Sequence, residues 1–396
     1  MMLAGSCAAH AFQGRRPQQG GEQAIEHIMT PRIDAHACFQ LAQAAFNCPD
    51  PTEARTLLQQ ALARYDEAVA AEPGNPILQY NRGLVLQHLE RHEEALACYD
   101  LALAVRPRHA DTMNNKGTVL LRLKRHAEAL ACFEAIFQLV PDHADAYSNA
   151  TMALLALNRP MDALASARRA VALRPRHADA HNQEGLALMA LQRPQEALAC
   201  YDRGLALQPD QARVWLNRAN AQLELGQLTQ ALVDVDRAIS LNPQDPQAPW
   251  HKGLCLLKSG VYPAGWALYE WRWKRDDFTS PRRGFAAPQW LGEPMRPGQT
   301  LLLHHEQGLG DTVQMLRYLP WLRAQGVRVV AEMPRPLMRL VAGMPGVDDC
   351  VPWGEPLPAF DWHCPVMSLP HALRDVVQGI PPPLQPLPLP EGLREH

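Results

Sequence analysis

The sequence predicts a mainly α fold, in which an α-solenoid is followed by a small, partial α/β domain. Two observations lead to this prediction. The middle of the 396-residue chain repeats with a period of 34 residues, which is long enough for two helices and their connections. From Thr300 onward this period is lost, and short apolar runs alternate with helix-like patterns around a glycine-rich loop.

Composition and charge exclude several classes of protein. Apolar residues make up 47% of the chain and charged residues 20%, as in globular proteins rather than disordered or membrane proteins. The formal net charge of -3 argues against a general nucleic-acid binder, which is usually markedly basic. No stretch is long and apolar enough to span a bilayer.

The first 30 residues are polar and glycine-rich, and we expect a disordered tail there, with Met1 or Met29 as the true start. They lack the basic leader and the apolar run of a signal peptide. The nine cysteines are scattered and form no Cys-x-x-Cys pair, so the sequence predicts neither a metal site nor a disulfide framework. Reduced cysteines suit a cytoplasmic protein.

Two helix-like stretches, 35–46 and 53–72, precede the regular repeats. The second carries small and aromatic residues at repeat-like positions and ends near Pro73. Terminal repeats of a solenoid need a more polar outer face. We therefore expect residues 31–75 to form an irregular pair of capping helices.

Six repeats are expected over residues 76–273. Small residues stand where two helices would approach closely, and a proline near the end of each repeat cannot continue the second helix. The residues at repeat position 8 are Gly83, Gly117, Thr151, Gly185, Ala219 and Gly253. The prolines at position 32 are Pro107, Pro141, Pro175, Pro209 and Pro243. This pattern resembles the tetratricopeptide repeat.

The resemblance implies a concave groove lined by the first helix of each repeat, in which a protein or an extended peptide binds. Position 6 of that helix carries a ladder of mainly carboxamide side chains: Asn81, Asn115, Asn149, Gln183, Asn217 and His251. Carboxamides both donate and accept hydrogen bonds, so a ladder of them can pair with a peptide backbone. The arrangement is similar to the asparagine ladder of O-linked N-acetylglucosamine transferase. The alternative is that asparagine is simply common at this position.

Two further features of the repeats have structural explanations. His109, His143 and His177 recur one repeat apart, but neighbouring repeats are about 8–10 Å apart, too far for one metal ion to bridge. We expect them to be loop residues.

The aromatic run at 266–273 is expected to cover the last helix and dock the next domain, with a sugar-stacking platform as the alternative. Residues 274–298 are expected to form a linker.

The α/β part is expected over residues 299–378. Strands are predicted at 300–304, 327–332, 347–352 and 360–364, and helices at 312–325, at 334–343 and from His371. Strands that alternate with helices predict a parallel, Rossmann-like sheet.

The loop after the first strand carries Gln307, Gly308 and Gly310, which could place backbone N–H groups toward an anion. The two glycines match part of a dinucleotide fingerprint, and Glu332 stands where a ribose-binding acid would, but Val313 occupies the third glycine position. Dinucleotide binding is therefore only a third alternative. A phosphate-binding P-loop is excluded, because no Gly-Lys-Ser/Thr follows.

The surrounding residues resemble a glycosyltransferase family 9 domain, the family of the heptosyltransferases. The resemblance rests on His304-His305-Glu306-Gln307-Gly308-Leu309-Gly310-Asp311-Thr312, Leu316-Arg317-Tyr318, Phe360-Asp361 and Ser368-Leu369-Pro370. It implies that Asp311 is a general base, that an acceptor sugar binds this domain, and that a second domain holds a nucleotide-sugar donor. Asp311 could alternatively cap the predicted helix at 312–325.

Residues 379–396 form a proline-rich tail where family members approach their second domain. We therefore expect the donor half to be absent, and with it any cofactor, unless another chain supplies that domain. The leading prediction is a protein-binding repeat scaffold joined to a glycosyltransferase-like half-domain that is inactive alone. The alternative is a sugar transferase, truncated in this sequence or completed by another chain.

Overall fold

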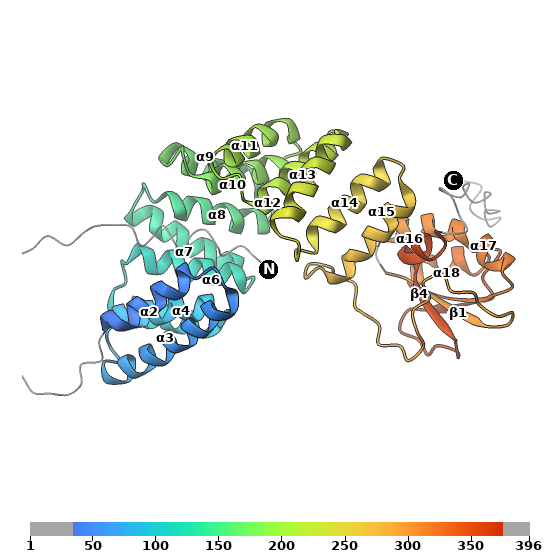
Figure 1. Cartoon of the computed structure of the whole chain (residues 1–396), viewed down its shortest axis with the longest axis horizontal. Coiled ribbons are helices and arrows are strands. Elements are labelled where there is room, and N and C mark those ends of the chain that lie inside the picture. The colour runs from blue at the N-terminus through green and yellow to red at the C-terminus, as the bar shows by residue number, and fades with distance from the viewer. Residues whose placement is uncertain (1–34, 307, 375–396) are drawn as a thin grey trace, which may run out of the picture. The chain divides into compact units, whose positions relative to one another are not determined.

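A computed structural model of the protein describes residues 35–306 and 308–374, which divide between residues 210 and 211 into two compact units (Figure 1). The first unit is entirely helical. The second contains further paired helices and a small parallel sheet. The predicted class, mainly α with a small α/β part near the C-terminus, is confirmed.

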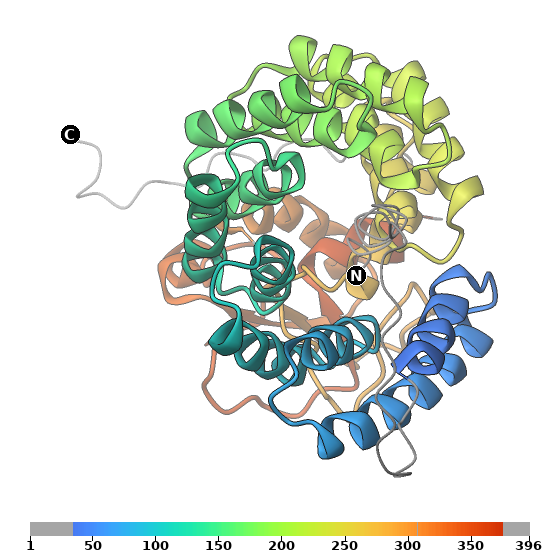
Figure 2. The same ribbon diagram turned by 90° about the vertical axis from the view of Figure 1, so that its left-hand side faces the viewer.

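The first unit consists of helices that pack in pairs, as Figure 2 shows for the segments drawn from blue to green. Its helices are α2 (Ala35–Asn47), α3 (Pro51–Ala71), α4 (Pro76–His88), α5 (His92–Val105), α6 (Ala110–Arg122), α7 (His126–Leu139), α8 (Ala144–Ala156), α9 (Pro160–Leu173), α10 (Ala178–Ala190) and α11 (Pro194–Leu207). The two helices predicted before the repeats are present within two residues of their expected ends. The second helix of each repeat ends two residues before its proline, as at Val105 and Pro107.

The turn inside each repeat requires a left-handed backbone. Four turns use residues other than glycine, Glu90, Lys124, Asn158 and Gln192, with φ between 57° and 62°. The same position is Gly226 and Gly260 in the last two repeats, with φ of 72° and 78°. Side chains other than glycine are strained in this region. The sharp turn between the paired helices therefore forms even at residues whose own backbone preference disfavours a positive φ.

Close packing between the two helices of a repeat explains the glycines at position 8. A Cβ added to Gly117 would lie 2.6 Å from the ring of Phe133, and one added to Gly185 would lie 2.3 Å from the ring of Tyr201. The repeat that carries Thr151 at position 8 instead has the small Ala167 opposite, and both residues are fully buried. A large residue on one helix is therefore matched by a small residue on the other.

This matching predicts the effect of exchanging side chains between repeats. Gly117→Ala should lower the free energy of unfolding by about 1–3 kcal/mol through overpacking, and Phe133→Ala by about 3–5 kcal/mol through a cavity. The double variant Gly117→Thr/Phe133→Ala copies the Thr151–Ala167 pair and should lose less than the sum of the two single changes. Urea denaturation followed by circular dichroism measures all three.

Gly74→Ala is the matched control, because a Cβ there would meet nothing within 4 Å. Additive losses in the double variant would show that the pair is not sterically coupled.

The second unit begins with two more helix pairs. They are α12 (Ala212–Glu224), α13 (Leu228–Leu241), α14 (Gln247–Lys258) and α15 (Tyr262–Tyr269), followed by the 3-10 helix η1 (Glu270–Lys274). In the last pair, a Cβ on Gly253 would lie 3.0 Å from the backbone nitrogen of Tyr269. Here the two helices approach through their backbones.

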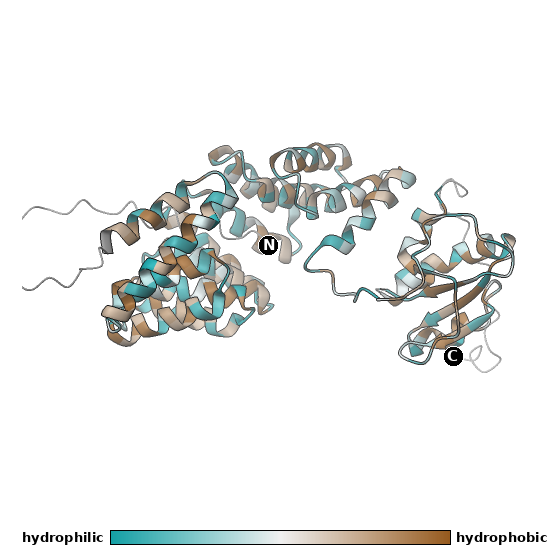
Figure 3. Ribbon diagram, turned by 60° about the horizontal axis from the view of Figure 1, so that its bottom comes forward, coloured by the Kyte–Doolittle hydropathy of each residue, from teal (hydrophilic) through white to brown (hydrophobic). Residues whose placement is uncertain are grey.

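A four-stranded parallel sheet follows, with strand order β3-β2-β1-β4. Its strands are β1 (Thr300–His304), β2 (Arg328–Met333), β3 (Asp349–Pro352) and β4 (Trp362–Pro365). The helical segments between and after them are α16 (Leu309–Met315), η2 (Leu316–Tyr318), α17 (Leu319–Ala324), α18 (Arg335–Val341), η3 (Val366–Ser368) and α19 (Leu369–Ala372). The ribbon in Figure 3 is brown, the colour of hydrophobic residues, over parts of the sheet.

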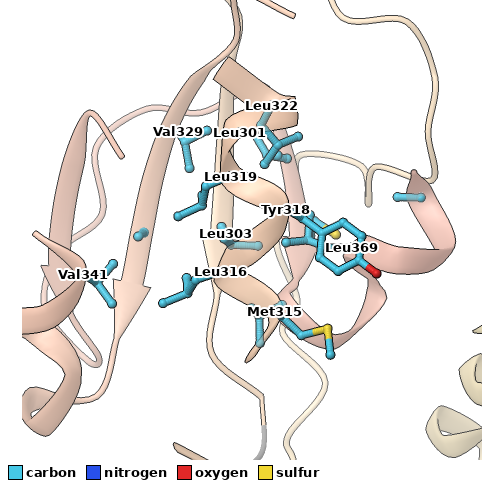
Figure 4. Packing of buried hydrophobic residues seen from close by; sticks show 14 of the residues in the cluster. Leu301, Leu303, Met315, Leu316, Tyr318, Leu319, Leu322, Val329, Val341 and Leu369 are labelled. Atoms are coloured by element: carbon cyan, nitrogen blue, oxygen red, sulfur yellow. The ribbon is translucent and has the colours of Figure 1, made fainter. Parts of the chain in front are cut away.

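The core of the second unit lies between the sheet and the segment 309–324. Leu316 and Leu319 from that segment pack with Leu301 and Leu303 of β1, and all four are fully buried (Figure 4). Trp266 and Tyr269 of α15 pack against the same cluster, as α15 and α19 are in contact. The prediction that the terminal aromatic residues dock the next segment is confirmed for these residues.

One helix prediction in this unit is wrong. The helix expected at 312–325 begins at Leu309 and is broken into α16, η2 and α17, because Pro320 has no N–H to continue the hydrogen-bonding pattern. The helix expected from His371 is present as α19, which begins two residues earlier, at Leu369, with Pro370 in its first turn.

Residues 274–298 contain no helix or named strand beyond the end of η1, but they pack against the sheet. Gln289 bridges His363 in a parallel sense, and the N–H of Trp290 donates to the carbonyl of His363 at 2.8 Å. Trp290 is buried in the core of the second unit. This segment therefore extends the sheet at its β4 edge.

Within the part of the chain that the structure describes, no helix has the length and apolar character needed to cross a membrane.

Candidate functional site

Two amide side chains at position 6, those of Asn115 and Asn149, are half-buried and interact with the preceding repeat. In the first unit, Asn115 Nδ2 donates to the hydroxyl of Tyr80 at 3.1 Å. Asn149 Nδ2 donates to Asn114 Oδ1 at 3.0 Å and to Thr118 Oγ1 at 3.4 Å. The donor end of both amides is therefore directed to the preceding repeat. Their Oδ1 atoms are the remaining groups that can accept a hydrogen bond.

The other ladder residues are not equivalent to these two. Asn81 is half-buried, whereas Gln183 is buried and its Oε1 has no hydrogen-bond partner among the described residues. In the second unit, Asn217 is half-buried and has interactions of its own. His251 stacks edge-on against Trp250, and burial followed by the nearby Arg275 lowers its pKa to about 4. His251 is therefore a neutral imidazole at pH 7.

Apolar and weakly polar side chains stand beside the amides. Thr118, Met152 and Leu186 lie three residues after Asn115, Asn149 and Gln183 on the same helices, and all three are half-buried. Residues three apart are neighbours on a helix surface. The first unit thus presents amides next to side chains that can contact an apolar ligand group.

The recurrent histidines are helix N-caps rather than simple loop residues. The backbone N–H of Thr112 donates to His109 Nδ1 at 3.3 Å, and that of Ala146 donates to His143 Nδ1 at 3.1 Å. His177 occupies the same N-cap position without a side-chain cap bond. In the described ranges, no three His, Cys, Asp or Glu side chains are grouped as metal ligands.

A second candidate site is an open cleft of about 470 Å³ in the second unit. It lies beyond the carboxyl ends of β1 and β3, where ligands of parallel sheets commonly bind. It is lined by Thr279, Ser280, Pro281, His305, Glu306, Gly308, Asp311 and Trp353. Only Gly308 and Asp311 were among the predicted site residues. Thr279, Ser280 and Pro281 come from the predicted linker, where the Ser280 hydroxyl donates to the carbonyl of Glu306 at 2.6 Å.

The structure brings Gly308 and Asp311 together. Gly308 has a φ of 59° and a ψ of 123°, a backbone conformation that favours glycine. A Cβ there would lie 2.6 Å from Asp311 Oδ2, which is the end of a side chain that can move, so the backbone rather than the available space favours glycine. A Cβ on Gly310 would meet nothing within 4 Å, so packing gives no reason for that glycine. Gln307 lies outside the described residues.

Asp311 is exposed in the first turn of α16. The helix begins two residues before it, with Gly308 as the N-cap. Asp311 is therefore not the N-cap of a helix starting at Thr312, but it lies in the first turn, where a negative charge favours the helix. Its carboxylate is left open to the cleft.

Glu306 forms one wall of the cleft and is held by a buried arginine from η1. Arg272 is 1% exposed and binds both carboxylate oxygens of Glu306, with the Nη2–Oε2 distance at 2.8 Å. The same guanidinium donates to Glu270 Oε1 and to Ser368 Oγ, each at 2.7 Å. Both oxygens of Glu306 are thus occupied, and its role is to shape the cleft.

Glu332 is also held in an ion pair with an arginine. It is 1% exposed, and Arg283 binds its two oxygens at 2.9 and 3.0 Å. A ribose-binding acid has to be open to its ligand and Glu332 is not, so this geometry does not support a dinucleotide site that uses Glu332.

A buried histidine pair lies next to this ion pair. His304 is 3% exposed, and its Nε2 is 3.2 Å from His363 Nδ1. Burial, followed by His363 and Arg283, lowers the pKa of His304 to about 3. Phe285 packs against both rings. No carboxylate of the described residues compensates a charge on this imidazole directly, so the folded state keeps it neutral.

This pair predicts acid sensitivity of the second unit. An unfolded histidine titrates near pH 6.5, whereas folded His304 does so near pH 3. Its contribution to stability is therefore complete above about pH 6.5 and is lost as the pH falls toward 3, with a slope of up to about 1.4 kcal/mol per pH unit. His304→Asn should reduce this slope.

All nine tryptophans belong to the second unit, so tryptophan fluorescence during urea denaturation measures its stability selectively. His177→Asn, in the first unit, is the matched control. An unchanged pH dependence in His304→Asn would assign the acid sensitivity to other groups.

Comparisons with known proteins bear on the repeats. Three protein-family models, each described as a tetratricopeptide repeat, match the chain. The first matches residues 74–134 and 108–176, the second residues 185–250 and the third residues 151–212. Together these matches cover residues 74–250 and end before the α/β part. No curated protein matches the chain.

Several solved structures are also similar. TTC0263, a thermophilic TPR protein of Thermus thermophilus, is 24% identical over 46% of this chain and 100% of that chain, with a TM-score of 0.43. A tetratricopeptide repeat protein from Parabacteroides merdae is 15% identical over 60% of this chain and 92% of that chain, with a TM-score of 0.48. YrrB, a TPR protein with an unusual peptide-binding site, is 25% identical over 46% of this chain and 95% of that chain, with a TM-score of 0.36.

Proposed function

We propose that the chain is a scaffold that binds an extended segment of another protein, because residues 74–250 match models of the tetratricopeptide repeat. The segment lies in a groove along the first helices of the repeats. The observation that supports this most directly is the hydrogen bond that each of Asn115 and Asn149 makes with the preceding repeat. Their Nδ2 atoms are fixed by the preceding repeat, so their Oδ1 atoms are held ready for the N–H groups of a ligand backbone.

The side chains beside the ladder add selectivity to this proposal. Met152 and Leu186 are half-buried and adjoin the amides, so they can contact apolar side chains of the ligand. Main-chain hydrogen bonds supply affinity for any sequence, and contacts with alternate side chains supply specificity. The ligand is therefore an extended peptide with free backbone N–H groups and apolar side chains.

This proposal predicts that Asn115→Ala/Asn149→Ala weakens peptide binding by about 1–3 kcal/mol, since each net hydrogen bond contributes about 0.5–1.5 kcal/mol. Peptides are selected from a displayed library against the native protein, and their affinities are measured by calorimetry. Gln138→Ala, at an exposed position of the second helix α7, is the matched control.

Circular dichroism checks that the double variant keeps its helices. If it binds the selected peptides as tightly as the native protein, the binding surface lies elsewhere on the repeats.

We propose a second function for the cleft, as the acceptor-binding half of a sugar transferase. The resemblance at residues 304–312 suggests this class, and the strand order β3-β2-β1-β4 corresponds to the inner part of a doubly wound sheet. The cleft volume suits a small ligand. Trp353 is 45% exposed and offers a ring for the apolar face of a sugar, while Asp311 offers a carboxylate to its hydroxyl groups.

Removal of the ring should weaken sugar binding. We expect Trp353→Ala to lower the affinity for a bound hexose or heptose methyl glycoside about tenfold, equivalent to roughly 1.4 kcal/mol. Asp311→Asn should weaken binding as well, because it removes the charge and keeps the shape. Saturation-transfer NMR identifies the bound glycoside, and calorimetry measures its affinity.

Trp321→Ala is the matched control, because Trp321 is 36% exposed on α17 and does not line the cleft. Equal loss in Trp321→Ala and Trp353→Ala, or no binding of any glycoside, would contradict a sugar site in this cleft.

A further inference from the structure

One hydroxyl group connects His305 to the loop that carries Asp311. Thr312 Oγ1 lies 2.8 Å from His305 Nδ1 and 3.0 Å from the carbonyl oxygen of Gly308. Thr312 is fully buried. A hydroxyl has a single proton, so it can donate to only one of these two partners. The hydroxyl donates to the carbonyl oxygen of Gly308, which also accepts the backbone N–H of Thr312 at 3.1 Å. With its proton used there, the hydroxyl accepts a hydrogen bond from His305 Nδ1.

We propose that Thr312 holds His305 in the tautomer that carries its proton on Nδ1, so that Nε2 is a proton acceptor in the cleft beside Asp311. This inference rests on the proposed role of the cleft as a ligand site. It adds a second basic group to the one expected there.

The surroundings of the ring support this assignment. The backbone N–H of His305 donates to the carbonyl of Glu332 at 3.0 Å, which fixes the start of the loop to β2. His305 Nε2 has no hydrogen-bond partner within the described ranges and is not among the buried unpaired atoms. His305 lines the cleft, and its ring centroid lies 5.7 Å from that of Trp353. Nε2 therefore remains accessible where a ligand would stack on Trp353.

The charged groups around His305 leave it neutral at pH 7. Burial lowers its pKa, and the negative charge of Glu332 opposes that effect. The charge of Glu332 is itself balanced by Arg283, and that of Glu306 by Arg272. Asp311 and His304 are the other titratable side chains near this ring, and His304 is neutral. A neutral imidazole has one nitrogen that can accept a proton.

The chemical class of ligand follows from this arrangement. A neutral Nε2 and a carboxylate in one cleft both accept protons, so they favour a ligand that donates from several hydroxyl groups, such as a sugar. They disfavour a phosphate or a carboxylate, which would meet Asp311 with like charge. His305 is positioned to accept a hydroxyl proton from such a ligand, either alone or together with Asp311.

The tautomer can be measured directly in the full chain without a ligand. In a long-range proton–nitrogen correlation of histidine-labelled protein, the His305 signals are identified by their loss in His305→Gln. We expect Nδ1 to carry the proton at pH 7 in the native protein and in Thr312→Ser, which keeps the hydroxyl. Thr312→Val removes the hydroxyl at nearly constant volume and should abolish this preference. A proton on Nε2 in the native protein, or an unchanged tautomer in Thr312→Val, would overturn the proposal.

A chemical probe gives a second readout that does not depend on a folded Thr312→Val variant. Diethyl pyrocarbonate reacts with an unprotonated, accessible imidazole nitrogen. Peptide mapping by mass spectrometry should show modification of His305 in the native protein, while His304, which is 3% exposed, reacts more slowly because its access is blocked. An unreactive His305 would show that Nε2 is not an accessible proton acceptor in the cleft and would overturn the proposal. Both readouts are independent of sugar binding, so they separate this inference from the function proposed for the cleft.

Discussion

The second unit depends on one buried guanidinium. Arg272, in the short helix that ends the repeats, is 1% exposed and binds Glu270, Glu306 and Ser368. Removing one partner of a buried ion pair costs about 3–5 kcal/mol, because the other charge is left uncompensated. Glu306 also forms a wall of the cleft. The last turn of the repeats and the cleft are therefore parts of one packed structure, although the sequence places them on either side of a supposed linker.

The repeats follow a different constraint, which acts within each helix pair. Gly117 faces Phe133 and Gly185 faces Tyr201, whereas Thr151 belongs to the pair with Ala167. A ring on the second helix is accommodated by glycine on the first, and a larger residue on the first helix is accompanied by a small residue on the second, as expected for closely packed interiors. The first helix, which carries the amide ladder, is thereby held at a fixed distance from the second.

Much of the fold could be predicted because its signals are local. The period, the prolines and the apolar strands each depend on residues that are close in sequence.

The break at Pro320 could have been predicted from the proline itself, but the apolar pattern on both sides of it favoured one helix. The histidine N-caps were missed because His109 and His143 are not among the usual capping residues. The lining of the cleft was not predictable in the same way, since Ser280 and Glu306, which are 26 residues apart in sequence, meet only in the folded chain. Asp311 and Gly308 were found from a motif, but His305 and Trp353 needed the geometry of the strand ends.

The volume matching within each pair also determines which pieces of this chain can be exchanged. A complete repeat carries both members of its steric pair, so duplication or transfer from proline to proline preserves the fit. A crossover at the turn between the two helices separates the partners. A first helix with Thr151 would then face a second helix with Phe133, and two large groups would compete for one space. Recombination within the repeat array is therefore tolerated at the ends of repeats and disfavoured at their central turns, so that the natural module of this scaffold is the intact helix pair.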